Sequence, residues 1–342
     1  MSALLLRSVA VLVLLLVGSH PAGAGAILDT IKGRGHLVCG SSTIHPGFAM
    51  VDGEGRWSGF DVDFCKAVAA AVLGDGSRTM FIPLGPQIRF DSLVNGEVDV
   101  LFRTTTWTLT RDAGLPLDFA AVTFFDGQAF MARRSRGWQH LDDVGPAIVC
   151  VEAGTTTLLN LEDYIRKRNQ PLKPLVFDSL EEAKRAFFRG RCDLYTTDAS
   201  ALAAIQMSDA PDPEAFVILP ERIFKEPLGP VVRNDDRQWF DIVKWVVFAT
   251  IEAEERGVTS VNVDDNPAPA RPPSLQRFLG IEPGIGILLG LDDRWVYRII
   301  RQYGNYGEIF NRNLGLASSL KQERGMNDLW TRGGLLYAMP LH

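Results

Sequence analysis

The 342-residue sequence has little of what several classes of protein require. Its 35 basic side chains are outnumbered by 41 acidic ones, for a net charge of −6. Such an acidic balance argues against a nucleic-acid-binding surface, which needs a basic stripe. The five histidines are scattered and no two cysteines form a C-x-x-C pair, which argues against a zinc site. We therefore expect neither a metal ion nor another cofactor, and no nucleic-acid partner.

The composition is that of a folded, globular protein. Hydrophobic residues make up 46% of the chain and charged residues 22%, which excludes a disordered chain, and 32 glycines with 19 prolines exclude a collagen-like one. The length exceeds what a single hydrophobic core usually holds, so at least two domains are expected.

The first residues are typical of a secretory signal peptide, which we place at 1–26. Arg7 provides the positive charge, residues 9–17 are continuously apolar, and small residues follow with two A-x-A cleavage frames, Ala22–Ala24 and Ala24–Ala26. The alternative is an uncleaved membrane anchor, but the apolar run is too short to cross about 30 Å of hydrocarbon. No later stretch is both long enough and free of charge. We expect a soluble exported protein.

Export changes the interpretation of the four cysteines. An even number of cysteines in an oxidising compartment suggests disulfides, and four cysteines allow three pairings. The spacing favours Cys39–Cys65 and Cys150–Cys192, because each pair joins a first strand to a nearby element of the same strand–helix unit.

From residue 35 onward, strand patterns alternate with helix patterns. The first series has predicted strands at 36–42, 79–84 and 98–104 and helices at 59–73 and 87–95. A second series repeats the order, with strands at 147–152, 172–177 and 191–197 and helices at 156–168 and 179–189. This alternation predicts an α/β fold with mostly parallel sheets.

The chain is expected to cross between two lobes twice. The extended stretch 121–134 joins the first series to the second, and the segments 217–224 and 230–233 lead back to a long amphipathic helix at 235–255. Two crossings imply a two-stranded hinge and a cleft that closes on a small ligand. We expect lobe 1 at 27–131 and 230–265, lobe 2 at 132–229, and a helical C-terminal extension at 266–342, with helices around 294–305 and 326–336.

Ligands of open α/β sheets bind beyond the carboxyl ends of the strands. The third strand of lobe 1 is followed by Arg103, a run of threonines that includes Thr106, and then Arg111. The guanidinium of Arg111 can bind a carboxylate through two hydrogen bonds, and Thr106 can donate another. In lobe 2, Asp198 follows the third strand and can accept from an ammonium group. Facing each other, Arg111 and Asp198 would match the main-chain groups of an α-amino acid.

A more ordinary interpretation of these charged residues stays open at this point. Arg111 could pair with Asp112 or Asp118 on the surface, and Asp198 could cap the helix that follows it. Neither role would involve a ligand.

Several motifs together resemble bacterial solute-binding protein family 3, and within it the general L-amino-acid-binding proteins of ABC transporters. The motifs cover nearly the whole mature chain and lie at 59–63, 99–111, 154–157, 192–198, 225–233, 304–308 and 329–335. The resemblance implies a two-lobed periplasmic-binding-protein fold in a periplasmic protein. Such a protein captures amino acids and delivers them to a membrane permease, and we expect it to be a monomer.

The resemblance also implies roles for individual residues. The arginine that matches Arg111 holds the α-carboxylate, helped by the residue that matches Thr106, and the aspartate that matches Asp198 binds the α-amino group. The residues that match Thr104 and Thr156 also contact the ligand. An aromatic or apolar wall comes from the positions aligned with His45 and Phe90. A tyrosine is frequent at the position of His45 in binders of basic amino acids, so the histidine favours broad recognition.

Two other classes of function are alternatives to a binding protein. An exported enzyme on the same fold, such as a dehydratase of a cyclic amino-acid precursor, would need a general acid in the cleft, and Asp198 or Glu152 could supply it. A ligand-sensing module would be joined to a transmembrane and signalling segment, and none follows His342. We therefore expect a binding protein, not an enzyme.

Overall fold

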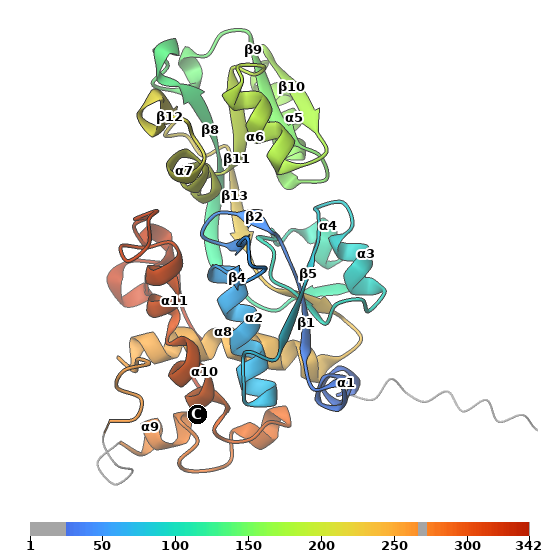
Figure 1. Cartoon of the computed structure of the whole chain (residues 1–342), viewed down its shortest axis with the longest axis vertical. Coiled ribbons are helices and arrows are strands. Elements are labelled where there is room, and N and C mark those ends of the chain that lie inside the picture. The colour runs from blue at the N-terminus through green and yellow to red at the C-terminus, as the bar shows by residue number, and fades with distance from the viewer. Residues whose placement is uncertain (1–24, 266–271, 342) are drawn as a thin grey trace, which may run out of the picture.

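The computed structural model describes residues 25–265 and 272–341 and consists of two lobes, each built on its own sheet (Figure 1). The sheet of lobe 1 has the order β5-β1-β6-β14-β7. Its strands are β1 (Leu37–Ser41), β5 (Thr79–Pro83), β6 (Val100–Leu101), β7 (Leu117–Phe119) and β14 (Val231–Arg233). β1 pairs in parallel with β5 and β6, as strand–helix alternation predicts, whereas β14 is antiparallel to its neighbours.

The sheet of lobe 2 has the order β10-β9-β11-β8-β12, with β13 also paired to β8. These strands are β8 (Phe124–Arg133), β9 (Ala147–Glu152), β10 (Leu172–Phe177), β11 (Leu194–Asp198), β12 (Phe216–Ile218) and β13 (Phe224–Leu228). Its helices are α5 (Thr156–Arg168), α6 (Leu180–Phe188) and α7 (Ala199–Ser208). Strands β9 to β11 thus repeat the parallel arrangement of β1, β5 and β6, which confirms the prediction of two copies of one unit.

Two antiparallel strands connect the lobes. β8 leads into lobe 2, and β13 runs back beside it with Phe224 opposite Gln128 and Leu228 opposite Phe124 (Figure 1). Only two residues separate β13 from β14, which already belongs to the sheet of lobe 1. The predicted two-stranded hinge is therefore present. The residue boundaries given for the lobes stay a prediction from the sequence.

The core of lobe 1 lies between its sheet and the helices α1 (Ala26–Arg34), α2 (Phe60–Leu73) and α8 (Arg237–Glu255). α2 is buried on almost every side, because its sequence is nearly all apolar. In the C-terminal extension, α10 (Trp295–Tyr303) and α11 (Tyr306–Asn313) join the same core, and the ring of Phe310 stacks on Phe124. The extension with α9 (Pro273–Phe278) is thus an added layer of lobe 1 (Figure 1).

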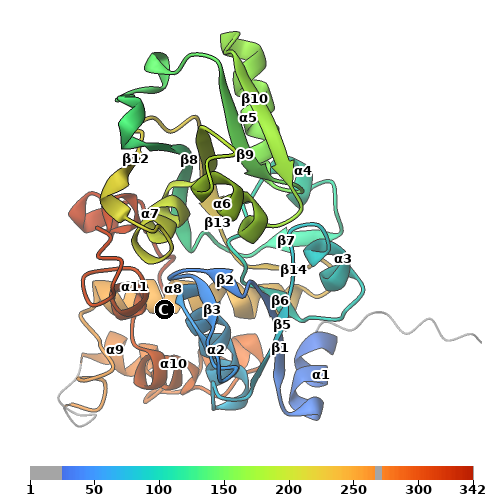
Figure 2. The ribbon, with the colours of Figure 1, turned by 45° about the horizontal axis from the view of Figure 1, so that its top comes forward.

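A small three-stranded sheet lies on the side of lobe 1 that faces lobe 2. It is formed by β2 (Ile44–His45), β3 (Ala49–Val51) and β4 (Trp57–Ser58), and sequence analysis did not predict it. Figure 2 shows β2 close to α6 and α7 of the opposite lobe, and Ile44 packs against the apolar cluster of lobe 2. This hairpin carries His45 to the cleft.

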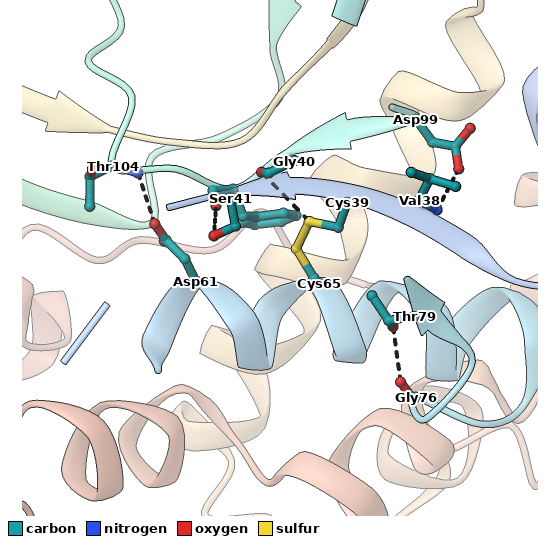
Figure 3. The surroundings of a disulfide bond; sticks show 11 residues. Val38, Cys39, Gly40, Ser41, Asp61, Cys65, Gly76, Thr79, Asp99 and Thr104 are labelled. Carbon is teal, nitrogen blue, oxygen red and sulfur yellow. Dashed lines mark hydrogen bonds between the residues drawn. A yellow bond between two sulfur atoms is a disulfide. The ribbon is translucent and has the colours of Figure 1, made fainter. Parts of the chain in front are cut away.

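Both predicted disulfides are present. Cys39 on β1 is bonded to Cys65 on α2 (Figure 3), and Cys150 on β9 is bonded to Cys192, just before β11. Each bond fixes the first strand of a lobe to a neighbouring element of the same unit. The described cysteines include no free thiol.

One predicted helix is wrong. The segment 326–336 forms two short 3-10 turns, Gly325–Asn327 and Trp330–Arg332, instead of a helix. Gly333 closes the second turn with φ of 88°, a left-handed conformation that a continuing helix does not contain. The third strands are also shorter or shifted: 98–104 contains only Val100–Leu101, and 191–197 becomes Leu194–Asp198.

Two short helices lie near the cleft, and a third lies at the start of the described chain. α3 (Arg89–Val94) and α4 (Leu109–Asp112) lie at the cleft edge of lobe 1, and α1 begins directly after Gly25. Apart from Gly25 and Ala26, the predicted signal peptide lies outside the described residues. Within those residues, no helix is both long and apolar enough to cross a membrane.

Candidate functional site

A polar cavity lies between the lobes at the carboxyl ends of their strands. Lobe 1 contributes His45, Arg89, Arg103, Thr104 and Thr106, and lobe 2 contributes Glu152, Thr155, Thr156, Thr157, Thr197 and Asp198. Its free volume is about 30 Å³, and a neighbouring hollow of about 170 Å³ shares His45, Arg103 and Glu152 with it. The cavity alone holds little more than one or two water molecules, so a ligand would have to use the adjoining hollow as well or enter while the lobes are further apart.

The lobes touch around this cavity. Thr106 Oγ1 lies 3.3 Å from Thr156 Oγ1, and the Gln87 amide donates to the backbone oxygen of Asp178 over 2.9 Å. Gly154 adopts φ of 71° at the turn before α5, and a Cβ there would lie 3.2 Å from Gln87 Cγ. Side chains from one lobe therefore contact the backbone of the other, as in a closed binding protein.

A buried carboxyl group accepts a hydrogen bond from the threonine-rich loop of lobe 1. Thr104 adopts a left-handed conformation, φ 42°, and its N–H donates to Asp61 Oδ2 over 2.8 Å (Figure 3). Asp61 lies in the first turn of α2, and burial raises its pKa to about 7 despite the Thr104 hydrogen bond and the Arg103 charge. This contact fixes the start of the loop that runs through Thr106 to Arg111.

Arg111 lies on α4, just behind the cavity wall. Its Nη1 donates to the Thr106 carbonyl over 2.9 Å, and its guanidinium lies 5.3 Å from the centre of the Phe90 ring. Among the described residues it forms no ion pair, so the predicted surface pairing with Asp112 or Asp118 is not made. Burial lowers its pKa, while the charges of Glu226 and Asp198 act in the opposite direction. The side chain contacts the loop that lines the cavity without being part of the lining itself.

Asp198 ends β11 and lies on the opposite wall. It precedes α7 but its side chain makes no capping hydrogen bond, so the alternative of a simple helix cap is wrong. Burial raises its pKa well above the ordinary value, the carboxylates of Asp126 and Glu226 raise it further, and Arg111 and Arg89 oppose them. A cation that entered the cavity would act in the same direction as Arg111 and Arg89 and favour the charged carboxylate.

His45 and Phe90, the predicted wall, have different environments. His45 lines the cavity, and its Nδ1 lies 2.6 Å from Ser42 Oγ. Burial, followed by the charges of Arg103 and Arg89, lowers its pKa to about 3, so the ring is neutral. Phe90 does not line the cavity. Its ring lies 4.9 Å from the Arg89 guanidinium and therefore supports two arginines, Arg89 and Arg111.

Thr156 begins α5, whose N-terminus opens onto the cavity after the cap residue Thr155. The Thr156 hydroxyl donates to Glu226 Oε2 over 3.0 Å, and the Asn160 amide donates to Glu226 Oε1 over 2.8 Å. Glu226, on the hinge strand β13, is fully buried, and burial raises its pKa. Its sequence motif, 225–233, was noted, but nothing in it pointed to a place beside the ligand cavity.

Two further arginines line the cavity, and sequence analysis gave neither a role. Arg89 begins α3 and is 3% exposed, and its Nε has no hydrogen-bond partner. Arg103 follows β6, is 5% exposed, and donates from Nε to the Leu84 carbonyl over 2.8 Å. Arg103 could be found because it follows a strand. Arg89 sits in a helix, where a charged side chain is usually exposed, so no sequence signal marked it.

Comparison with known proteins agrees with this geometry. The model of the bacterial extracellular solute-binding proteins, family 3, matches residues 37–255. The chain belongs to this family. The matched residues include every strand of both lobes and all of the cavity lining, so the predicted resemblance is confirmed.

Relatives extend the similarity beyond the family model. The chain is 47% identical to the general L-amino acid-binding periplasmic protein AapJ of Rhizobium johnstonii over 96% of both chains. It is 46% identical to the glutamate/glutamine/aspartate/asparagine-binding protein BztA of Rhodobacter capsulatus, over 93% of this chain and 94% of that protein.

A solved structure is similarly close. It is an ABC transporter periplasmic binding protein from Brucella ovis with glutathione bound, which superposes with a TM-score of 0.88 at 46% identity. The match covers 92% of this chain and 99% of the Brucella chain. The C-terminal extension, which lies beyond the family model, is thus shared with these members of solute-binding family 3.

Proposed function

We propose that this chain is the periplasmic substrate-binding component of an amino-acid ABC transporter and that it captures L-amino acids with broad specificity. The observation that supports this proposal is the interlobe cavity, which has arginines on the wall of lobe 1, the carboxyl groups of Glu152 and Asp198 on the wall of lobe 2, and threonine hydroxyl groups on both. A zwitterion fits this arrangement, because each of its charged ends meets the opposite charge.

In this proposal Arg111 and Thr106 hold the α-carboxylate and Asp198 holds the α-ammonium. Thr104 and Thr156 complete the polar shell, with His45 lining the cavity and Phe90 supporting the guanidinium of Arg111. Arg111 would have to turn from the Thr106 carbonyl, or share its remaining N–H groups, to reach the ligand. A carboxylate offers two oxygens to such a planar fork, which makes that exchange favourable.

Binding and closure are coupled in this mechanism. The ligand contacts lobe 1 through its carboxylate and lobe 2 through its ammonium, so it interacts fully only with the closed form. A ligand shifts a conformational equilibrium by its differential affinity for the two states. The closed form is then the signal for release of the amino acid to the membrane permease, the partner that the family implies.

The named relatives support the class of ligand and the location. AapJ is named as a general L-amino acid-binding periplasmic protein, and BztA as a binder of four acidic or amide amino acids. The neutral His45 provides no fixed charge that would select one side chain. An enzyme would use Glu152 or Asp198 as an acid, but membership of a solute-binding family supports binding over turnover.

The decisive experiment is calorimetry on the mature protein with a panel of amino acids. Arg111→Ala should weaken binding of every amino acid by about 100-fold or more, because the α-carboxylate is common to all of them. Loss confined to one side-chain class would show that Arg111 does not hold the main chain. Chemical change of a bound amino acid during prolonged incubation would instead support the enzyme.

The signal peptide is predicted at 1–26, but the contacts of Gly25 favour the first of the two cleavage frames, so that export removes residues 1–24. The N–H groups of Gly25 and Ile27 donate to the buried Asp236 carboxylate over 3.1 and 2.9 Å. Cleavage after Ala26 would delete the first of these donors and the start of α1. Mass spectrometry of the exported protein should therefore find Gly25 as its first residue, and a mature chain beginning at Ile27 would contradict this.

A further inference from the structure

Arg89 is a buried cation that forms no ion pair with any described residue. It is 3% exposed and lines the cavity, yet among the described residues its guanidinium takes part in no hydrogen bond or ion pair. Its described interaction is with the Phe90 ring, 4.9 Å away. Burying an unpaired charge is costly, so native proteins rarely keep one unless a partner arrives later.

Arg103 adds a second guanidinium to the same part of the cavity. Its Nε is used by the Leu84 carbonyl, while its other N–H groups make no described hydrogen bond. Arg103 also lines the adjoining hollow with Gln87, Asp178 and Ser179, so the cavity continues past it. Arg103 thus lies where the two hollows meet, and Arg89 lines the first of them.

The acidic groups of the described chain attract the two arginines but form no ion pair with either of them. The Glu152 carboxylate attracts Arg89 and Arg103 electrostatically but lies within ion-pair distance of neither, and it accepts a hydrogen bond from the Leu180 N–H over 2.8 Å. Asp198 also attracts both arginines, and Asp61 attracts Arg103, but neither carboxylate forms an ion pair with them. Because the proposed function assigns Asp198 to the ligand ammonium, Glu152 is the carboxylate of the lobe 2 wall that is left for the two cations. An additional negative charge placed between the arginines would complete the balance.

We propose that Arg89 and Arg103 form a subsite for a second carboxylate, at the end of the ligand remote from its α-carbon. This inference rests on the proposed function and sharpens it: the preferred ligands are acidic. Acidic amino acids and small peptides that end in a carboxylate share this chemistry. An amide can accept a hydrogen bond from a guanidinium but leaves its charge uncompensated, so glutamine binds more weakly than glutamate.

The test is calorimetry with isosteric pairs, L-glutamate against L-glutamine and L-aspartate against L-asparagine. The wild-type protein should prefer the acid of each pair. Arg89→Gln should lower the glutamate-to-glutamine preference by about 10-fold or more, as for the loss of a charge-assisted hydrogen bond. Arg103→Gln should act in the same direction. Arg78→Gln, which changes an exposed arginine just before β5, is the matched control and should leave the ratio unchanged.

A second readout separates this role from a structural one. Because the unpaired guanidinium of Arg89 destabilises the empty closed protein, Arg89→Gln should keep or raise the melting temperature without ligand while it weakens glutamate binding. Equal weakening of glutamate and glutamine, or a wild-type preference for glutamine, would overturn the subsite. If the wild-type protein bound none of the four amino acids, the proposed function itself would fail. Stronger binding of glutathione than of glutamate would assign the subsite to peptides.

Discussion

The two walls of the cavity carry opposite charges. Lobe 1 presents Arg89 and Arg103, with Arg111 directly behind, whereas Glu152 and Asp198 lie on the wall of lobe 2 and Glu226 lies on the hinge strand. None of the three arginines is within ion-pair distance of these carboxylates, although the charges attract one another across the space. Each wall is therefore only half of a site, and a ligand with both charges completes it.

The pKa shifts of the buried carboxyl groups also differ between the two lobes. On lobe 1, Asp61 holds the loop that lines the cavity, and because burial raises its pKa to about 7 it offsets only part of the positive charge. On lobe 2, burial and the neighbouring carboxylates of Asp126 and Glu226 raise the pKa of Asp198 well above its usual range. An ammonium group bound beside Asp198 would favour the charged form of this carboxyl group.

An effect comparable to that of Arg111→Ala should come from removing the acidic contact of lobe 2. Asp198→Asn keeps the shape of the side chain but leaves the ligand ammonium without its counter-charge, so affinity for every amino acid should fall by about 100-fold. Calorimetry measures the loss, and Asp163→Asn, at an exposed position on α5, is the control. Unchanged affinity would mean that the two-wall arrangement does not bind the ammonium group.

Much of the fold could be predicted from the sequence, because local signals and packing agree there. α5 begins and ends as predicted, since Thr155 caps its first turn and Asn169 closes it in a left-handed conformation. The disulfide pairing also followed from the repeated strand–helix unit. The wrongly predicted helix at 326–336 contains apolar residues at helical spacing, but Gly333 and Gly334 break it.

The candidate site was only partly predictable. Thr104, Thr106 and Asp198 follow strands in the sequence, and strand ends mark the cleft of an α/β sheet. Arg89 comes from the start of α3, which packs against β6 and β14 of lobe 1, and its side chain lines the cavity between the lobes. Such a contact is set by tertiary packing, so neither periodicity nor spacing marks the residue.

A smaller effect is expected from the neutral histidine on the positive wall. The folded pKa of His45 is about 3, well below the unfolded value of 6.5, because of burial and the charges of Arg103, Arg89 and Lys184. The unfolded chain then binds the extra proton between these values, so stability falls as the pH is lowered through 6.5. Between pH 7.5 and 5 this contribution is about 2 kcal/mol.

His45→Gln should remove that part of the pH dependence. Chemical denaturation of the ligand-free protein at pH 7.5 and at pH 5 measures the free energy of unfolding of each variant. The difference between the two pH values should shrink by about 2 kcal/mol relative to wild type. His140→Gln, at an exposed histidine of lobe 2, provides the comparison. An unchanged difference would show that His45 is protonated in the folded protein and that the wall is less positive than its arginines suggest.

The smallest effect on amino-acid binding is expected from removing an uncharged contact between the two lobes. Gln87 is the lobe 1 side chain that donates to the Asp178 carbonyl of lobe 2, over 2.9 Å, and it packs against Gly154. Gln87→Ala removes this contact only from the closed form, so it should weaken amino-acid binding by about fourfold, the value of one neutral hydrogen bond. Gln139→Ala changes an exposed glutamine of lobe 2 and should leave amino-acid binding unchanged.

Small-angle scattering of the Gln87→Ala variant with saturating ligand should still show closure of the lobes. The ligand charges, and not the Gln87 amide, provide most of the driving force for closure. If Gln87→Ala prevented closure under saturation, interlobe packing would outweigh charge complementarity in holding the lobes together.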